Sequence, residues 1–117
     1  MDRNFAIQFA NEWISAWNAH NIEQVLTHYT DNFEMNSPKI VRIIGEPSGK
    51  LKGKAKVREY WTKALDRMPD LHFELITVLV GVESVTLYYH GVGRQPAAEV
   101  FHFNTYGKVV KAYAHYE

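Results

Sequence analysis

Hydrophobic residues near the amino terminus repeat at the spacing of a helix. Phe5, Phe9, Trp13 and Trp17 lie four positions apart, and this period is typical of an amphipathic helix and not of a strand. The pattern predicts a first helix over residues 3–19.

A second, shorter helix is predicted directly after the first. Asn21, followed three residues later by Gln24, resembles a capping box, in which two side chains satisfy free backbone donors at a helix start. Hydrophobic residues then continue at helical spacing up to Tyr29.

The next segment loses the helical period. We interpret residues 33–37 and 40–44 as two short strands interrupted at Pro38, because proline cannot donate to a strand ladder. Residues 45–53 are mainly Gly, Pro, Ser and Lys, which indicates a loop.

A third helix is predicted over residues 54–68, and Pro69 ends it. Its hydrophobic positions follow the i, i+3, i+4, i+7 pattern. They are Val57, Tyr60, Trp61, Ala64, Leu65 and Met68.

The carboxyl-terminal half changes to a strand pattern. Residues 71–80, 84–90, 98–103 and 108–116 are rich in β-branched and aromatic side chains, and short turns separate them. Such short connections join only antiparallel neighbours. The chain is therefore expected to be one domain, residues 1–117, of the α+β class, with three N-terminal helices packed on one face of a strongly curved antiparallel sheet.

The strand over 71–80 is apolar on both of its faces. Strict alternation places Phe73, Leu75 and Leu79 on one face, and the other face carries Ile76, Val78 and Val80. Tyr113 and His115 on the last strand continue this second face. Since helices cover only one side, we expect a homodimer through the outer sheet face; a few scattered surface hydrophobic residues are the simpler alternative.

Composition narrows the classes of function. The 117 residues include thirteen basic and thirteen acidic side chains, no cysteine, and sixteen aromatic residues. Thiol chemistry and disulfides are excluded. No apolar run is long enough for a signal sequence or a membrane span, so the expected location is cytoplasmic, without a membrane partner.

Metal and nucleic-acid sites find little support. None of the six histidines has a partner at a metal-binding spacing. Residues 39–67 carry an excess of six positive charges in a Gly-rich setting, which favours a solvated loop over a nucleic-acid surface. The alternative is that this loop attracts an anionic substrate. No nucleotide-binding glycine motif is present, and no cofactor is expected.

Several short stretches in this order give the chain a family resemblance. They are residues 13–19 (WISAWNA), 29–33 (YTDNF), Ser37-Pro38, Gly53-Lys54, 58–61 (REYW), 101–104 (FHFN) and 107–110 (GKVV). Together they resemble the nuclear transport factor 2-like superfamily, in particular its SnoaL-like and ketosteroid-isomerase-like branch. The fold hosts isomerases, cyclases, dehydratases, hydrolases and inert modules, so the resemblance does not specify a reaction.

The resemblance implies a cone-shaped pocket between the helices and the curved sheet. Trp13, Trp17, Tyr60 and the Ser37-Pro38 step would form part of its wall. Strand alternation adds three sets of side chains. They are Tyr88, His90 and Val92; Glu99, Phe101 and Phe103; and Ala112, Ala114 and Tyr116.

The same resemblance implies candidate catalytic residues. Ketosteroid isomerase uses an aspartate base and an oxyanion hole of a tyrosine and a protonated aspartic acid. The corresponding positions are Ser37, Trp13 and Glu99, so only Glu99 keeps a carboxyl group. Glu99 and His90 could form a proton-shuttling pair or an inert buried pair, and Ser37 with His90 could form a nucleophile, although no elbow motif supports it.

The sequence thus predicts a protein that binds a small, largely apolar molecule in an aromatic pocket. Such a protein would be either a cofactor-independent isomerase, cyclase, dehydratase or hydrolase, with Glu99, His90 and Ser37 as candidate catalytic residues, or a non-catalytic dimerisation or ligand-binding module. The predicted pocket residues are Trp13, Trp17, Tyr60, Tyr88, Phe101 and Tyr116.

Overall fold

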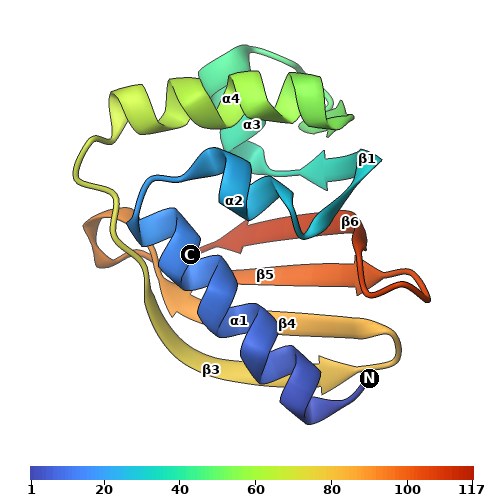
Figure 1. Ribbon diagram of the computed structural model, residues 1–117. Coiled ribbons are helices and arrows are strands. Elements are labelled where there is room, and N and C mark those ends of the chain that lie inside the picture. The colour runs from blue at the N-terminus through green and yellow to red at the C-terminus, as the bar shows by residue number, and fades with distance from the viewer.

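The computed structural model describes residues 1–117 as four helices, one 3-10 turn and six strands (Figure 1). The helices are α1 (Arg3–Asn18), α2 (Ile22–Leu26), α3 (Pro38–Ile44) and α4 (Lys54–Arg67), and η1 (Val92–Arg94) is the 3-10 turn. The strands are β1 (Tyr29–Asn36), β2 (Lys50–Lys52), β3 (Glu74–Gly81), β4 (Ser84–His90), β5 (Pro96–Phe103) and β6 (Val109–Tyr116).

The strands form one curved sheet in the order β2-β1-β6-β5-β4-β3. Figure 1 shows α1 crossing one face of this sheet, with α3 and α4 above the end that holds β1. The α+β class and the helix-covered, curved sheet are confirmed. The sheet is mixed, because β1 runs parallel to β6, whereas the sequence led us to expect antiparallel strands throughout. A parallel pair needs a long crossover, and α3, β2, α4 and the whole β3–β5 meander provide it.

The predicted strand over 40–44 is wrong, since these residues belong to α3. Ser37 caps this helix by accepting a hydrogen bond from the Lys39 backbone N–H at 3.1 Å, and Pro38 occupies the first turn. Gly45 ends the helix with a φ of 80°, a conformation that glycine adopts without strain. The Ser-Pro start and Gly stop therefore outweigh the β-branched residues between them.

The segment expected to be a loop, 45–53, contains the short edge strand β2. It pairs with β1, with Leu51 opposite Met35. Lysines on both sides of Leu51 point to solvent, and charged side chains on an edge strand discourage pairing with other chains.

A bulge in β3 changes the predicted division of its side chains. The register shifts between Leu75 and Thr77, so Leu75 and Val78 both point to the helix-covered face. Leu79, which strict alternation placed beside Leu75, is 55% exposed on the outer face. The extra residue that the bulge inserts reverses the alternation beyond it.

An aromatic core lies between α1 and the inner sheet face. Phe9 contacts Phe101 and Phe103 edge to face, with centroids 4.9 and 5.0 Å apart. Trp13 stacks on Phe73 at 5.6 Å, and Trp17 meets Trp61 of α4 at 5.0 Å. The four-residue spacing along α1 thus gives one continuous buried stripe.

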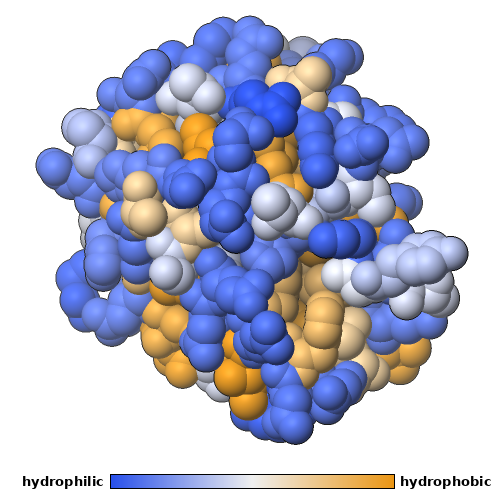
Figure 2. Space-filling view, viewed as in Figure 1, coloured by the Kyte–Doolittle hydropathy of each residue, from blue (hydrophilic) through white to orange (hydrophobic).

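The surface seen from the helix side is mainly hydrophilic, with small separate hydrophobic patches (Figure 2). No helix combines the length and the apolar content that a membrane crossing requires.

Candidate functional site

A cavity of about 50 Å³ lies between α1, α4 and the inner face of the sheet. Its wall is mostly hydrophobic, with Trp13 and Trp17 from α1, Trp61 from α4 and Phe73 from the segment before β3. The charged residues on the wall are Lys39 and Glu99. The cavity is smaller than a typical ligand site, so an occupant must be small or must displace side chains.

Glu99 is the buried acid of this cavity. It lies in the middle of β5, opposite Leu87 of β4 and Ala114 of β6, and its side chain is 4% exposed. The hydroxyl of Tyr89 donates a hydrogen bond to Glu99 Oε1 at 3.2 Å. Burial raises the pKa of Glu99 to about 7, and the opposing effects of the Tyr89 hydrogen bond and the Lys39 charge are smaller. Near neutral pH, the carboxyl can therefore gain or lose a proton.

Tyrosine hydroxyls surround this carboxyl from several elements. Burial raises the pKa of Tyr60 to about 12, and it raises the pKa of Tyr89 and of Tyr116 well above the usual range, with the Glu99 charge acting in the same direction. All three phenols keep their protons near neutral pH. They can donate hydrogen bonds but do not act as bases there.

Lys39 enters the cavity wall from the first turn of α3. Its Nζ lies 4.2 Å from the centre of the Tyr116 ring, a cation–π contact. Burial lowers the pKa of Lys39, the nearby Arg42 lowers it further, and the Glu99 charge opposes both effects. Lys39 was not predicted as a site residue, because nothing in the pattern of residues 37–45 places it beside Glu99.

Ser37 caps the start of α3 next to the cavity. Its buried hydroxyl accepts the backbone N–H of Lys39 at 3.1 Å and so fixes the start of α3. The same hydroxyl interacts with Tyr60 and Tyr116 and opposes the rise in the pKa of each. No hydrogen bond joins Ser37 to a histidine, so the structure does not assemble the serine–histidine pair considered above.

The predicted facing of β4 is wrong by one residue. Tyr88 pairs with Ala98 on the outer face and is 38% exposed, whereas Tyr89 points into the cavity. His90 has the same facing as Tyr88 and does not line the cavity. The alternation of the buried residues Val85, Leu87 and Tyr89 was the signal that could have set the register.

His90 instead lies in a polar cleft of about 220 Å³ beside the cavity. Its Nδ1 is 4.0 Å from Glu74 Oε1, and Arg94 approaches the same carboxylate at 4.0 Å. The expected pairing of His90 with Glu99 is therefore not formed, because the two side chains lie on opposite faces of the sheet. Gly91 and Val92 line both the cleft and the cavity, so they separate the two spaces.

The remaining predicted pocket residues divide into wall and core. Trp13, Trp17, Tyr60 and Tyr116 line the cavity. Phe101 is fully buried behind Trp13, with ring centroids 5.3 Å apart, and it supports the wall without being part of it. The indole N–H of Trp13 donates to the Tyr29 hydroxyl at 2.9 Å, whereas the buried indole N–H of Trp17 has no hydrogen-bond partner.

The structure gathers no three His, Cys, Asp or Glu side chains into a group that could hold a metal ion. The polar chemistry of the cavity is that of Glu99, Lys39, the tyrosine hydroxyls and the Trp17 indole.

Comparison with solved structures finds one protein of high sequence identity and others that share the fold. The chain is 55% identical to a SnoaL-like protein of unknown function from Burkholderia thailandensis, over 99% of this chain and 97% of that one, with a TM-score of 0.95. An NTF2-like protein of unknown function from Burkholderia pseudomallei is 14% identical, with coverage of 100% and 92% and a TM-score of 0.79.

A third neighbour has a described role. It is SalBIII, an epoxide hydrolase/cyclase-like enzyme in pyran ring formation in polyether salinomycin. The identity is 16%, the coverage is 99% of this chain and 93% of that one, and the TM-score is 0.77, so the likeness is one of fold. No curated protein matches the chain.

The sequence model of the SnoaL-like domain matches residues 10–113, from the middle of α1 to Tyr113 in β6. The mixed curved sheet with its covering helices agrees with the NTF2-like neighbours. The chain therefore belongs to the SnoaL-like domain family, and its fold is that of the nuclear transport factor 2-like proteins.

Proposed function

We propose that this protein binds a small, largely apolar molecule in the cavity at Glu99, and that Glu99 serves there as the acid/base group of a cofactor-independent reaction. The observation that carries the proposal is a carboxyl group buried on the wall of an aromatic cavity, with a single hydrogen-bond donor on one of its oxygens. The reaction class is isomerisation, cyclisation, dehydration or hydrolysis, each of which needs proton transfer.

The chemistry of Glu99 suits proton transfer in either direction. A general acid or base works best when its pKa is close to the working pH, and burial brings the pKa of Glu99 to about 7. Tyr89 holds one oxygen in place, which leaves the other available to a ligand. The hydrophobic wall strengthens any interaction that the carboxyl makes by excluding water.

The test combines a ligand screen with one isosteric change. Small hydrophobic metabolites are screened by the rise in melting temperature of the wild-type protein, since a ligand that binds only the folded state must stabilise it. Turnover of each hit is then compared between wild type and Glu99→Gln, which keeps the shape but cannot exchange the proton. We expect binding to persist and turnover to fall at least about 100-fold, the usual contribution of general acid–base catalysis.

A matched variant controls for nonspecific effects. Glu74→Gln removes a carboxylate from the neighbouring cleft. This carboxylate contacts His90 and Arg94 but lies outside the cavity wall. This change is expected to leave turnover unaltered. Unchanged turnover in Glu99→Gln would remove the acid/base assignment, and the absence of any stabilising ligand would remove the binding assignment as well.

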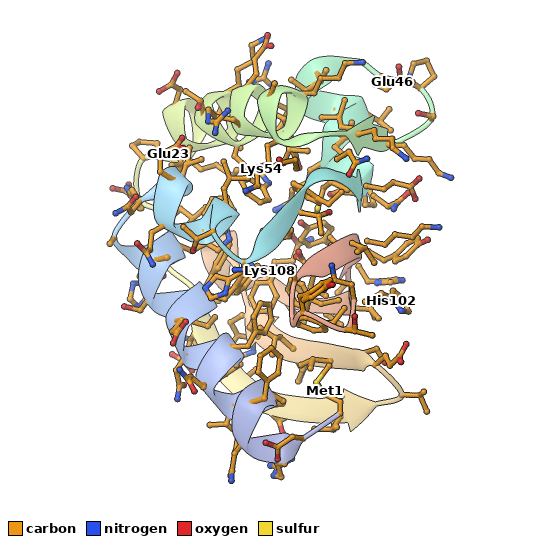
Figure 3. The ribbon with its side chains drawn as sticks, turned by 45° about the vertical axis from the view of Figure 1, so that its right-hand side comes forward. Met1, Glu23, Glu46, Lys54, His102 and Lys108 are labelled. Carbon is orange, nitrogen blue, oxygen red and sulfur yellow. The ribbon has the colours of Figure 1, made fainter.

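A second candidate function rests on the outer sheet face. Ile76, Leu79 and Tyr88 are 43%, 55% and 38% exposed there. His102 and Tyr113 pack edge to face, with ring centroids 5.8 Å apart, and Figure 3 shows His102 pointing away from α1. We propose that two copies pair through this face, as a homodimer whose cavities remain on the far side of each sheet.

A further inference from the structure

The cavity wall carries one cation and several groups that can donate hydrogen bonds. Lys39 contributes an ammonium group, Tyr60 and Tyr116 contribute hydroxyls, and Trp17 contributes an indole N–H. Glu99 carries the one carboxyl group on this wall, and one of its oxygens already accepts from Tyr89. A ligand with acceptor atoms of its own therefore suits this wall.

One of these donors lacks the partner that burial normally demands, and a second has no carboxylate partner. Trp17 is 5% exposed and its Nε1 has no hydrogen-bond partner, although buried N–H groups are almost always paired. Lys39 is partly buried, and no carboxylate oxygen lies within 4.0 Å of its Nζ; its contact is the Tyr116 ring. A positive charge in this setting is stabilised by an anion that enters the cavity.

The size and polarity of the cavity limit the anion. A volume of about 50 Å³ with a mainly aromatic wall disfavours a doubly charged group, which would lose too much hydration. A carboxylate carries one charge and two acceptor oxygens, enough for Lys39 and one neutral donor. Met35 and Met68 also line the wall, and their flexible side chains can move aside for the apolar part of the ligand.

We propose that the ligand of this cavity is a small apolar carboxylic acid, bound as its carboxylate against Lys39, with the Trp17 indole as a second donor and Glu99 in its neutral form. This inference rests on the proposed function and names the chemical class of its ligand. The excess of positive charge over residues 39–67, which includes Lys39 and Arg42, would attract such an anion toward the cavity.

The neutral form of Glu99 makes binding depend on pH. The groups that face Glu99 are Tyr89 from β4, Tyr116 from β6, Tyr29 from β1, Tyr60 from α4 and Lys39 from α3. The four tyrosines stay protonated, so Glu99 is the group that titrates near pH 7. Above that pH, its negative charge repels the ligand carboxylate, and binding then requires that Glu99 take up a proton.

The experiment compares acids with their neutral amides. The isotope-labelled full chain is titrated at pH 6 and pH 8.5 with two pairs of ligands: benzoate and benzamide, and propionate and propionamide. NMR spectra follow the Trp indole N–H signals. We expect each acid to bind at least about tenfold more tightly than its amide at pH 6, the effect of one net ion pair. The indole signal of Trp17 is expected to shift when an acid binds. The indole signal of Trp13 should not shift, because its N–H already donates to Tyr29.

Two further expectations test the named residues. In wild type, the affinity for each acid should fall about tenfold for each pH unit above 7, because Glu99 must take up one proton on binding. In Glu99→Gln, the affinity should be independent of pH. Lys39→Met should abolish the preference for acids over amides. Lys56→Met, which removes an exposed lysine of α4 outside the cavity wall, should leave that preference intact.

The possible failures separate the two proposals. Equal binding of acids and amides, or a preference for acids that survives Lys39→Met, would overturn the carboxylate assignment while the cavity remained a binding site. If neither acids nor amides move the Trp17 signal and the metabolite screen also gives no hit, both the ligand class and the proposed function are wrong.

Discussion

Glu99 links the chemistry of the cavity to the stability of the fold. An ordinary glutamate has a pKa of 4.5, and burial raises the pKa of Glu99 to about 7 in the folded protein. Between these two pH values, the folded chain holds a proton that the unfolded chain has released. Since the folded state then binds more protons, the free energy of unfolding falls as pH rises through this window.

The first prediction concerns this pH dependence. A difference of about 2.5 pKa units corresponds to about 3 kcal/mol, fully present below pH 4.5 and lost by the time the pH exceeds about 7. Glu99→Gln cannot ionise, so its stability relative to wild type should increase from pH 5 to pH 8. Urea unfolding of both proteins at a series of pH values measures the difference. A stability difference that does not change with pH would show that Glu99 is not desolvated as the structure indicates.

At the scale of elements, α3 shows how a short segment shapes the site. Seven residues between Ser37 and Gly45 turn the chain after β1 and place Lys39 on the cavity wall. The hydroxyl of Ser37 satisfies the Lys39 backbone N–H, which would otherwise be one of the free donors at the helix start. Ser37, whose position resembles that of the base in ketosteroid isomerase, thus stabilises a helix here.

The second prediction concerns this cap. Ser37→Ala should lower the free energy of unfolding by about 1 kcal/mol, the usual value of an N-cap hydroxyl. Ser15→Ala, at an exposed position inside α1, should leave stability unchanged or slightly higher, because alanine is the better helix former. Urea unfolding of the two variants compares them directly. An equal effect at both positions would mean that the Ser37 hydroxyl does not cap α3.

Helices with a clear hydrophobic repeat were predictable from the sequence. The facing of side chains on strands with a bulge or an uncertain register was not. The four-residue repeat of α1 and the wide apolar face of α4 leave little choice of structure. By contrast, the bulge at Leu75 and the facing of Tyr88 each depend on a shift of one residue, which reverses every side chain beyond it. The cavity residues were therefore predicted correctly on the helices, as with Trp13, and on β5 and β6, as with Glu99 and Tyr116. They were predicted wrongly on β4.

The position of Lys39 beside Glu99 could not be predicted from the sequence either. It is separated from Glu99 by sixty positions, and their proximity depends on β1 pairing with β6 in parallel. No periodicity within either segment carries this information, since a parallel crossover brings together residues that are remote in the chain. Only the assembled fold places the lysine, the acid and the tyrosines around one cavity.

At the scale of the whole molecule, the two faces of the sheet have different surroundings. The inner face is covered by helices and holds the cavity, and the outer face leaves Ile76, Leu79 and Tyr88 partly exposed. An exposed apolar face on an antiparallel meander is usually covered by a partner. Because Glu99 and Leu79 lie on opposite faces, self-association and ligand binding should be separable by mutation.

The last prediction uses this separation. Wild-type protein at micromolar concentration should sediment with twice the chain mass of 13.6 kDa. Leu79→Glu should sediment as the monomer, because the dimer would have to bury the new charge in its interface. Val82→Glu is the matched control, since Val82 is 90% exposed in the turn between β3 and β4, and it should leave the dimer intact. The Leu79→Glu monomer should still bind cavity ligands, as shown by the shift of the Trp17 signal. A wild-type protein that sediments at 13.6 kDa would contradict the dimer, and loss of ligand binding in the monomer would show that the two faces are coupled.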